Sequence, residues 1–554
     1  MSIEVKIEDC LIQNNILILK GYTVVRGLDI STIKRKLIIK NKATKKEINI
    51  DLKPSLRTDL SYIYKEDKTN YDNCGFDDIK IKLEEFSNGK WDVFVKLEKL
   101  NETIYYERIE VKLAQLKTKI RKNIILNQEN KKIVRINFDE STKLYIQVYD
   151  YDKIKYLKLK IREKERNLKI IKRLLKEKRY STIFCLFLNT YFKNIILKKD
   201  VWLMGERPDT AQDNTYHLYK YIVNNKPDIN AIYVIDKKSK DYNSIKNLGK
   251  VIQFNSILHT LYLLNCKFTI NSYSEKANMY SDDYKTIIKY WDIPKNKKIF
   301  LQHGVIGVSR VNHVLHKNRM NYDMFVVSSE FEKEHIIKEF GYSKEEVKIT
   351  GLARWDNLKE VRDKKILLMP TWRSWIKSED ELIESNYFKT YIDFINDKLL
   401  VDILEKHNIK MTFYPHYQVQ KVLSDVKISN PYVTVVKQGE QTVQELINSH
   451  SLLITDYSTV SFDFAYMYKP VIFYQFDYDE FYSNHYNEGP INHKKDLFAP
   501  RAINKEELFK VLEKNIDLKE MDKKYKLNRN KYINKIENNI CNEIFEFIYL
   551  LAEY

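Results

Sequence analysis

Cysteine is scarce in this 554-residue sequence, which has five widely spaced cysteines and no CxxC pair. An odd number of isolated cysteines provides neither a disulfide framework nor the spacing of a zinc finger. No other cluster of metal-ligating residues stands out, so the sequence predicts no metal and no cofactor. These features favour a reducing, cytoplasmic compartment.

Long apolar runs are also absent. No uninterrupted stretch reaches the roughly 18 to 20 apolar residues that span a bilayer. The N-terminal segment from Met1 to Lys6 lacks the charged-then-apolar layout of a signal peptide. We therefore expect a protein that does not cross a membrane and is not secreted by that route.

Glycine is rare, with twelve in the chain, so a glycine after a strand is a candidate for a backbone constraint. Each such glycine is equally compatible with a plain turn. Five fall in suggestive places: Gly205, Gly304, Gly307, Gly351 and Gly489.

Positive charge is abundant, with 95 Lys and Arg against 76 Asp and Glu, a formal net charge of +19. Such an excess attracts polyanions, whether nucleic acid, anionic lipid or a phosphate-bearing substrate. A basic nucleic-acid-binding protein is one alternative. No recognisable nucleic-acid module supports it, and much of the excess lies in one segment, so we expect no nucleic-acid partner.

The first 165 residues contain short alternating runs typical of an antiparallel β domain. Residues 78–83 and 91–97 are two such runs, and Ser87-Asn88-Gly89 between them predicts a hairpin turn. Further runs at 47–52, 103–113, 132–138 and 143–149 favour a sandwich. We predict an accessory domain over residues 1–165.

A basic connector follows. Residues 151–180 hold thirteen Lys and Arg against four Asp and Glu, and residues 181–192 are uncharged. A basic helix before an apolar helix is typical of an anchor lying on an anionic membrane surface. A solvated basic face beside an ordinary buried helix gives the same pattern, so both interpretations of residues 166–198 stay open.

From residue 199 onward, apolar strands alternate with helices, which indicates parallel α/β architecture. The predicted strands lie at 231–236, 267–271, 323–327, 365–369, 410–414, 451–455 and 470–474. Their number favours two doubly wound Rossmann-type domains, over 199–348 and 349–520, with C-terminal helices over 521–554. Ligands bind such domains at the carboxyl ends of their strands.

Candidate catalytic side chains follow several of these strands. His303 and His416 each come directly after a strand, where an imidazole can exchange a proton near neutral pH. The pair Thr371 and Arg373 follows another strand and places a guanidinium where it could clamp phosphate oxygens. A structural histidine and a surface ion pair are the alternatives.

The segment 453–474 is the densest in candidate residues. A helix predicted to start near Ser458 would point free N–H groups of Ser458 and Thr459 at a phosphate. Asp456 and Asp463 would accept hydrogen bonds from hydroxyls or orient a His or Arg. Capping of the helix by Asp456 or Ser458 is the simpler interpretation, and it is compatible with anion binding.

Together these stretches resemble the CDP-glycerol glycerophosphotransferase family, the polymerases and primases that build teichoic-acid-type poly(polyol phosphate). The similarity covers about residues 200 to 510. Its most specific element is 455–465 followed by 469–477. Supporting elements are Asp213-Asn214, 216–221, His303-Gly304, 351–356 with Gly351 and Arg354, 370–373, His416 and Gly489-Pro490.

The resemblance implies a GT-B-like pair of domains, with the acceptor on the first and a CDP-polyol on the second. It implies that His303 is the general base on an acceptor hydroxyl, and that CMP departs. His416, Arg373, Ser458 and Thr459 would hold the pyrophosphate, with Thr371, Asp456, Gly351 and Arg354 beside the donor, and with Gly304, Asp463, Asp213 and Asn214 as further site candidates.

Four positions depart from the usual family pattern: Gln302, Arg310, Ala353 and Tyr417. They leave the donor open between CDP-glycerol, CDP-ribitol and another activated alcohol. We expect glycerol phosphate transfer to an anionic polymer or glycolipid acceptor at the inner face of the cell membrane, in teichoic acid or capsule synthesis. A GT-B glycosyltransferase using a nucleotide sugar is the alternative. The oligomeric state is not readable.

Overall fold

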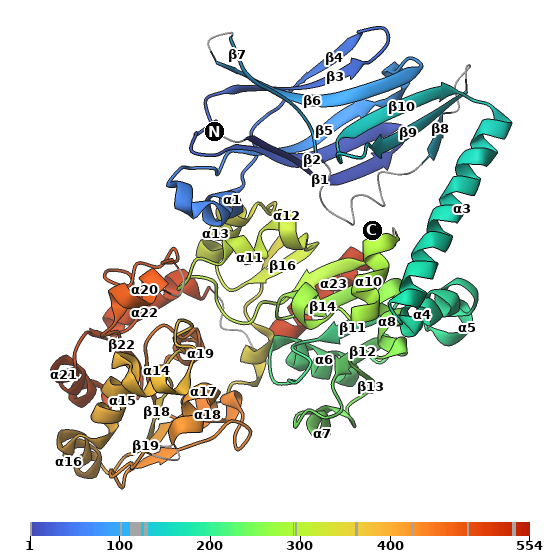
Figure 1. Ribbon diagram of the computed structural model, residues 1–554. Coiled ribbons are helices and arrows are strands. Elements are labelled where there is room, and N and C mark those ends of the chain that lie inside the picture. Colours follow the sequence, from blue (N-terminus) through green and yellow to red (C-terminus); the bar gives the residue numbers. More distant parts are fainter. Residues whose placement is uncertain are drawn as a thin grey trace.

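The computed structural model describes residues 3–99, 102–110, 123–126, 131–291, 293, 296–359, 364–423, 426–484, 487–534 and 539–553. Figure 1 shows an N-terminal β domain, a long helix that leaves it, and two α/β regions below. The part of the predicted strand 103–113 beyond residue 110 lies outside the described residues.

The N-terminal domain is a pair of antiparallel sheets, as predicted, with one short helix, α1 (Thr58–Ile63). Alternate side chains of both sheets meet in one core that includes Leu17, Trp91 and Val134. The first sheet has the order β1 (Ile3–Gln13), β2 (Ile16–Val25), β5 (Gly75–Lys82). The second has the order β4 (Glu47–Asp51), β3 (Lys34–Asn41), β6 (Gly89–Lys99), β10 (Leu144–Asp150), β9 (Lys132–Phe138), β8 (Asn123–Leu126), with β7 (Glu102–Arg108) on β6.

The predicted hairpin at residues 87–89 is wrong. Strand β5 pairs with β2, whereas β6 pairs with β3, β7 and β10, so the connection passes from one sheet to the other. Phe86 is buried and packs edge-on against Trp91 at 5.0 Å, which holds the crossing in the core. Gly89 has a φ of +126°, as a turn residue would, but the chain turns between layers.

The connector is three helices, α3 (Lys153–Lys176), α4 (Tyr180–Tyr191) and α5 (Lys193–Ile196). Only Leu159 and Leu174 of α3 are buried. Helix α4 buries Thr182 and Cys185 but leaves large aromatic side chains exposed on its other face. The apolar helix is therefore neither fully buried nor free of the protein. Among the described residues, no helix is long and apolar enough to cross a membrane.

The first α/β domain has a parallel sheet of seven described strands, more than the sequence indicated because several have four residues or fewer. Their order is β13 (Lys250–Gln253), β12 (Ala231–Ile235), β11 (Trp202–Gly205), β14 (Phe268–Asn271), β15 (Lys297–Phe300), β16 (Met324–Val327), β17 (Val347–Ile349). The helices are α6 (Asn214–Asn225), α7 (Tyr242–Ile245), α8 (Ile257–Asn265), α9 (Glu275–Asn278), α10 (Asp282–Tyr290), α11 (Asn312–Leu315), α12 (Lys317–Met320) and α13 (Glu330–Phe340).

The second α/β domain has a parallel sheet of six described strands. Their order is β20 (Val433–Val435), β19 (Lys410–Phe413), β18 (Lys365–Leu368), β21 (Leu452–Thr455), β22 (Val471–Tyr474), β23 (Arg501–Ala502). The helices are α14 (Glu379–Glu384), α15 (Asn386–Asn396), α16 (Lys398–His407), α17 (Tyr417–Val422), α18 (Val443–Ser449), α19 (Val460–Tyr466), α20 (Tyr478–Asn484), α21 (Lys505–Asn515) and α22 (Lys523–Tyr532).

The C-terminal helix α23 (Ile540–Glu553) returns to the first α/β domain and packs against α6. Phe545 stacks on Trp202 at 5.5 Å, and the Tyr221 hydroxyl donates to Asn542 at 2.6 Å. The chain therefore passes between the two domains twice, once through the 3₁₀ helix η3 (Ala353–Asn357) and once before α23.

A main-chain seam also joins the domains. The N–H of Gly489 donates to the Val308 carbonyl at 3.0 Å, and the N–H of Ile491 donates to the Gly307 carbonyl at 3.1 Å. A β-carbon on Gly489 would lie 2.1 Å from the Gly307 carbonyl oxygen. Glycine is therefore required here for close backbone approach rather than for a turn.

Candidate active site

His303 lies three residues after β15, at the carboxyl edge of the first parallel sheet. Its side chain is 59% exposed, while its Nδ1 contacts the buried Asp213 Oδ2 and its ring stacks on Tyr273 at 4.5 Å. An ionised carboxylate only accepts, so this contact assigns the proton to Nδ1 and leaves Nε2 with a lone pair. The pair can thus accept a proton from a bound hydroxyl.

Asp213 is fixed by its place as the N-cap of α6. Its Oδ1 accepts from the N–H of Asn214 and from Arg354 Nη1, both at 2.8 Å. Burial alone would oppose ionisation, but His303 and Arg354 outweigh it and lower the pKa of Asp213 to about 2. The group is therefore a carboxylate at neutral pH and holds the imidazole in one tautomer.

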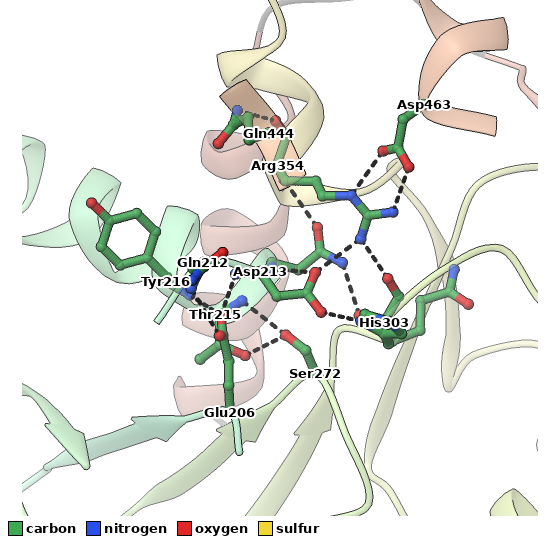
Figure 2. Close-up of polar contacts among 12 residues, drawn as sticks. Glu206, Gln212, Asp213, Thr215, Tyr216, Ser272, His303, Arg354, Gln444 and Asp463 are labelled. Atoms are coloured by element: carbon green, nitrogen blue, oxygen red, sulfur yellow. Dashed lines mark hydrogen bonds and ion pairs between the residues drawn. The ribbon is translucent and has the colours of Figure 1, made fainter. Parts of the chain in front are cut away.

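Arg354 connects the two domains at this point (Figure 2). Its Nε and Nη2 donate to Asp463 of α19 at 2.8 and 2.9 Å, and its Nη1 also reaches the His303 carbonyl. Asn214 adds to the junction by accepting from the Arg354 N–H at 3.0 Å and donating to the Gln302 carbonyl at 2.8 Å. The guanidinium is buried and paired, so this geometry positions His303 rather than offering a free cation to a phosphate.

Glu206, which sequence reasoning missed, lies beneath Asp213 and directly follows Gly205 (Figure 2). It accepts N–H bonds from Gln212 at 3.1 Å, Asp213 at 2.8 Å and Tyr216 at 2.9 Å. Burial and the neighbouring Asp213 raise its pKa to about 8. The only available signal was its position directly after a strand-end glycine.

A second missed carboxylate, Glu332 of α13, holds the loop that carries His303. It accepts from the N–H groups of Ile306 and Ser328, both at 2.6 Å, and from Gln302 Nε2 at 3.3 Å. Burial raises its pKa to about 7 even though these donors act in the opposite direction. Gln302 itself has a φ of +49°, a strained conformation that the fold must stabilise from outside the loop.

Gly304 brings the second domain against this loop. A β-carbon at residue 304 would lie 2.4 Å from Thr459 Oγ1 and 2.9 Å from Thr459 Cβ. Thr459 is the N-cap residue of α19, which begins at Val460, and its side chain makes no capping hydrogen bond. Ser458 Oγ accepts weakly from the Val460 N–H at 3.3 Å. Neither Asp456 nor Ser458 caps the helix in the usual way. Ser458 and Thr459 stay half-buried, and Thr459 lines the same cavity as His303.

Arg373 differs from the prediction. It is fully buried, and its guanidinium is paired with Asp477 at 2.7 Å and with Asp456 at 2.8 Å, while its Nη1 donates to the Thr371 carbonyl at 2.6 Å. The expected phosphate clamp is therefore wrong for this structure. Arg373 instead anchors Asp456, which in turn accepts from the Thr371 N–H at 2.8 Å.

His416 caps α17 and stacks on Trp372 at 5.2 Å. Burial, followed by the positive charge of Arg207 from the first domain, lowers its pKa to about 4. The imidazole is therefore neutral at pH 7. The structure places it on the second domain, facing the charge of the first.

Two cavities adjoin these residues. One of about 280 Å³ runs along residues 302–309 and includes His303, Tyr457 and Thr459. The other, of about 530 Å³, is lined by Trp372, Gln418, Lys377 and Lys421, among others. Gly351 lies outside both linings, and its φ of +90° marks the chain reversal before η3. The described residues contain no group of His, Cys, Asp and Glu suited to a metal ion.

Known proteins are similar to this chain in sequence. The minor teichoic acid biosynthesis protein GgaB of Bacillus subtilis (strain 168) is 33% identical over 368 residues, which is 64% of this chain and 40% of GgaB. A teichoic acid glycerol-phosphate transferase of Staphylococcus aureus is 24% identical over 55% of this chain and 80% of its own. The chain thus spans well under half of GgaB.

The fold also has a solved counterpart. The wall teichoic acid polymerase TagF superimposes with a TM-score of 0.54 at 16% identity, covering 71% of this chain and 98% of that one. The family model of the CDP-Glycerol:Poly(glycerophosphate) glycerophosphotransferases matches residues 186–550. The match includes both α/β domains, the His303–Asp213 pair and most of α23, and the chain therefore belongs to this glycerophosphotransferase family.

Proposed function

We propose that the protein transfers a polyol phosphate from a CDP-polyol to a hydroxyl of an anionic polymer or glycolipid acceptor and releases CMP. The observation that carries this proposal is the exposed His303 imidazole, held by the buried Asp213 at the boundary of the two domains. Family membership supplies the reaction class, and the geometry supplies the base.

His303 Nε2 takes the proton of the acceptor hydroxyl as its oxygen attacks the donor phosphorus distal to cytidine. The new oxygen–phosphorus bond forms, the pyrophosphate bond to CMP breaks, and the electron pair leaves with CMP. Asp213 keeps Nδ1 protonated and stabilises the imidazolium that forms. Tyr273, stacked on the ring, limits its rotation.

The donor occupies the second domain, near the 530 Å³ cavity. Lys377 and Lys421 supply positive charge for the pyrophosphate, and Trp372 supplies an aromatic face beside His416. Ser458 and Thr459 precede α19 of this domain, where Thr459 lies against Gly304, and they contact the transferred phosphate. Thr371, Asp456, Gly351, Arg354 and Arg373 shape the site rather than bind the donor.

Glycerol phosphate is the first choice of transferred group, in a GT-B-like arrangement of the two domains. The names of the relatives include both poly(glycerol phosphate) and poly(ribitol-phosphate) polymerases, and one TagF structure was soaked with CDPG. CDP-ribitol is therefore the second donor to test, and the product belongs to the teichoic acid or capsule class.

The connector supports a proposed location at the inner face of the membrane. Helix α3 presents Arg162, Lys169 and Lys172 among many exposed cations, and α4 exposes Phe184 and Phe187, each 48% accessible. Exposed basic and aromatic side chains on consecutive helices suit an anionic bilayer, which also carries the lipid-linked acceptor.

The test is acceptor-dependent CMP release from CDP-glycerol and from CDP-ribitol. His303→Ala should abolish release and leave CDP binding intact, because a base acts on the acceptor. His407→Ala, a histidine paired with Asp517 away from the cavities, is the matched control. Turnover of a nucleotide sugar alone would contradict the proposal and favour a glycosyltransferase. Tight, salt-dependent binding of nucleic acid without transfer would favour the remaining alternative.

A further inference from the structure

A third cavity, of about 370 Å³, lies beside the second parallel sheet and shares no lining residue with the two cavities described above. Its walls come from the loop before β23, from the first residue of β23 and from α22. Four cationic side chains line it, and none of its lining residues is Asp or Glu: Lys494, Lys495, Arg501 and Lys524. Such a wall attracts an anion.

His493, another lining residue, adds an unpaired hydrogen-bond donor. Gln475 Oε1 accepts from Arg501 Nε at 2.8 Å, which fixes the orientation of the amide because arginine only donates. Gln475 Nε2 therefore donates, to the Asp456 carbonyl at 2.8 Å and to His493 Nδ1 at 2.7 Å. With Nδ1 acting as acceptor, a neutral imidazole carries its hydrogen on Nε2.

The imidazole is neutral at pH 7 because burial, followed by the charge of Arg501, lowers the pKa of His493 to about 4. The residue is 1% exposed, and within the described chain its Nε2 has no hydrogen-bond partner. A buried N–H without an acceptor is unfavourable. His493 lines a cavity whose wall already carries four cations.

The unpaired N–H of His493 and the cationic lining without Asp or Glu are independent observations. An oxyanion with several acceptor oxygens could accept from the N–H and pair with the cations. We propose that this cavity binds a phosphate group, and that the phosphate is a phosphodiester of the polyol phosphate polymer on which the enzyme acts. The second part rests on the proposed function. Free phosphate has the same chemistry and is the other source to be tested.

The surroundings give the cavity a link to catalysis. Residues 488–491, just before His493, form the main-chain seam with residues 307–309 of the first domain. Gln475 joins His493 to the carbonyl of Asp456, the residue that Arg373 anchors in the candidate active site. A polymer phosphate held here would keep the product on the enzyme beside the domain junction between transfers.

The test compares two triple variants with the same change in charge. Lys494→Gln/Lys495→Gln/Lys524→Gln removes exposed cations of the cavity, and Lys510→Gln/Lys514→Gln/Lys519→Gln removes exposed cations elsewhere in the same domain. Titration calorimetry with a defined glycerol phosphate oligomer and with inorganic phosphate measures binding. We expect the cavity variant to bind the oligomer about tenfold more weakly or worse, and the control within twofold of wild type.

Nitrogen-15 NMR of histidine side chains gives a second readout. Phosphate or oligomer should shift the His493 Nε2 signal in wild type and in the control. Equal binding by both variants, with an unmoved signal, would overturn the site. Binding of inorganic phosphate but not of the oligomer would overturn its assignment to the polymer. Absence of CMP release with an intact phosphate site would reject the proposed function alone, because a single-transfer assay with a monomeric acceptor does not need the cavity.

Discussion

Replacement of Asp213 by Asn tests the central geometric argument. Oδ1 of Asp213 accepts from the Asn214 N–H and from Arg354 Nη1, and both donors remain in the variant. The asparagine must therefore keep its oxygen there and turn its amide NH₂ toward His303 Nδ1. An NH₂ group donates, so the imidazole must present a lone pair at Nδ1 and carry its hydrogen on Nε2. The base is then blocked without any change in size.

The size of the expected fall in kcat follows from the loss of general-base catalysis. General-base catalysis contributes about 10² to 10⁴ in rate, and enforcing the wrong tautomer removes most of it. We expect kcat to fall about 10³-fold, with little change in the KM for the donor, which binds to the other domain. Rapid-quench measurement of CMP release from CDP-glycerol under single-turnover conditions gives the value.

The control is Asp228→Asn, an exposed aspartate of the same domain. Calorimetric unfolding checks that both variants are native. A folded Asp213→Asn enzyme with a rate within threefold of wild type would refute the assignment of His303 as a base oriented by Asp213.

Three further predictions follow from contacts and exposed charges described above. Gly304→Ala should lower kcat about 10²-fold, because the new β-carbon would overlap Thr459. The double variant Gly304→Ala/Thr459→Gly should be more active than Gly304→Ala but less active than wild type, because Thr459 also contacts the transferred phosphate; equal activity of the single and double variants would place the defect elsewhere. The pKa of Asp213 is about 2 in the folded protein, against about 3.9 in the unfolded chain, which contributes about 2 kcal/mol to the free energy of unfolding at any pH above the unfolded pKa. This contribution, measured as the difference from Asp213→Asn, should disappear as the pH falls from about 5 to 2. A difference that stays constant over this range would contradict the prediction. Four exposed cations at or just beyond the C-terminal end of α3 are Lys172, Arg173, Lys176 and Lys178. Neutralising them should release the protein from phosphatidylglycerol vesicles in flotation assays, whereas unchanged flotation would leave α3 a purely structural role.

Periodicity predicted the larger features well. Alternating runs such as 132–138 became strands, and the apolar runs before His303 and His416 became parallel strands whose carboxyl ends carry these residues. The periodicity of apolar residues is a local signal, because a few consecutive residues show whether one face of a segment or both faces are buried. The resemblance to a known family added the order of the motifs and the nature of the reaction.

Features that depend on distant partners were not predictable. Nothing near residue 87 shows that β5 and β6 join different sheets, since that choice depends on β2 and β3. Arg373 looked like a phosphate ligand because its two carboxylate partners lie 83 and 104 residues away in the chain. Glu206 and Glu332 carry no motif, and only the fold shows that their carboxylates support Asp213 and the His303 loop.

The return of α23 to the first α/β domain has a consequence for biosynthesis. Phe545 and Asn542 complete the packing around Trp202 and Tyr221, residues that leave the ribosome more than three hundred positions earlier. The first of the two domains to be translated must therefore wait, with part of its apolar surface uncovered, until the second domain and α23 have been made. Its native state is reached last, although its strands are synthesised first.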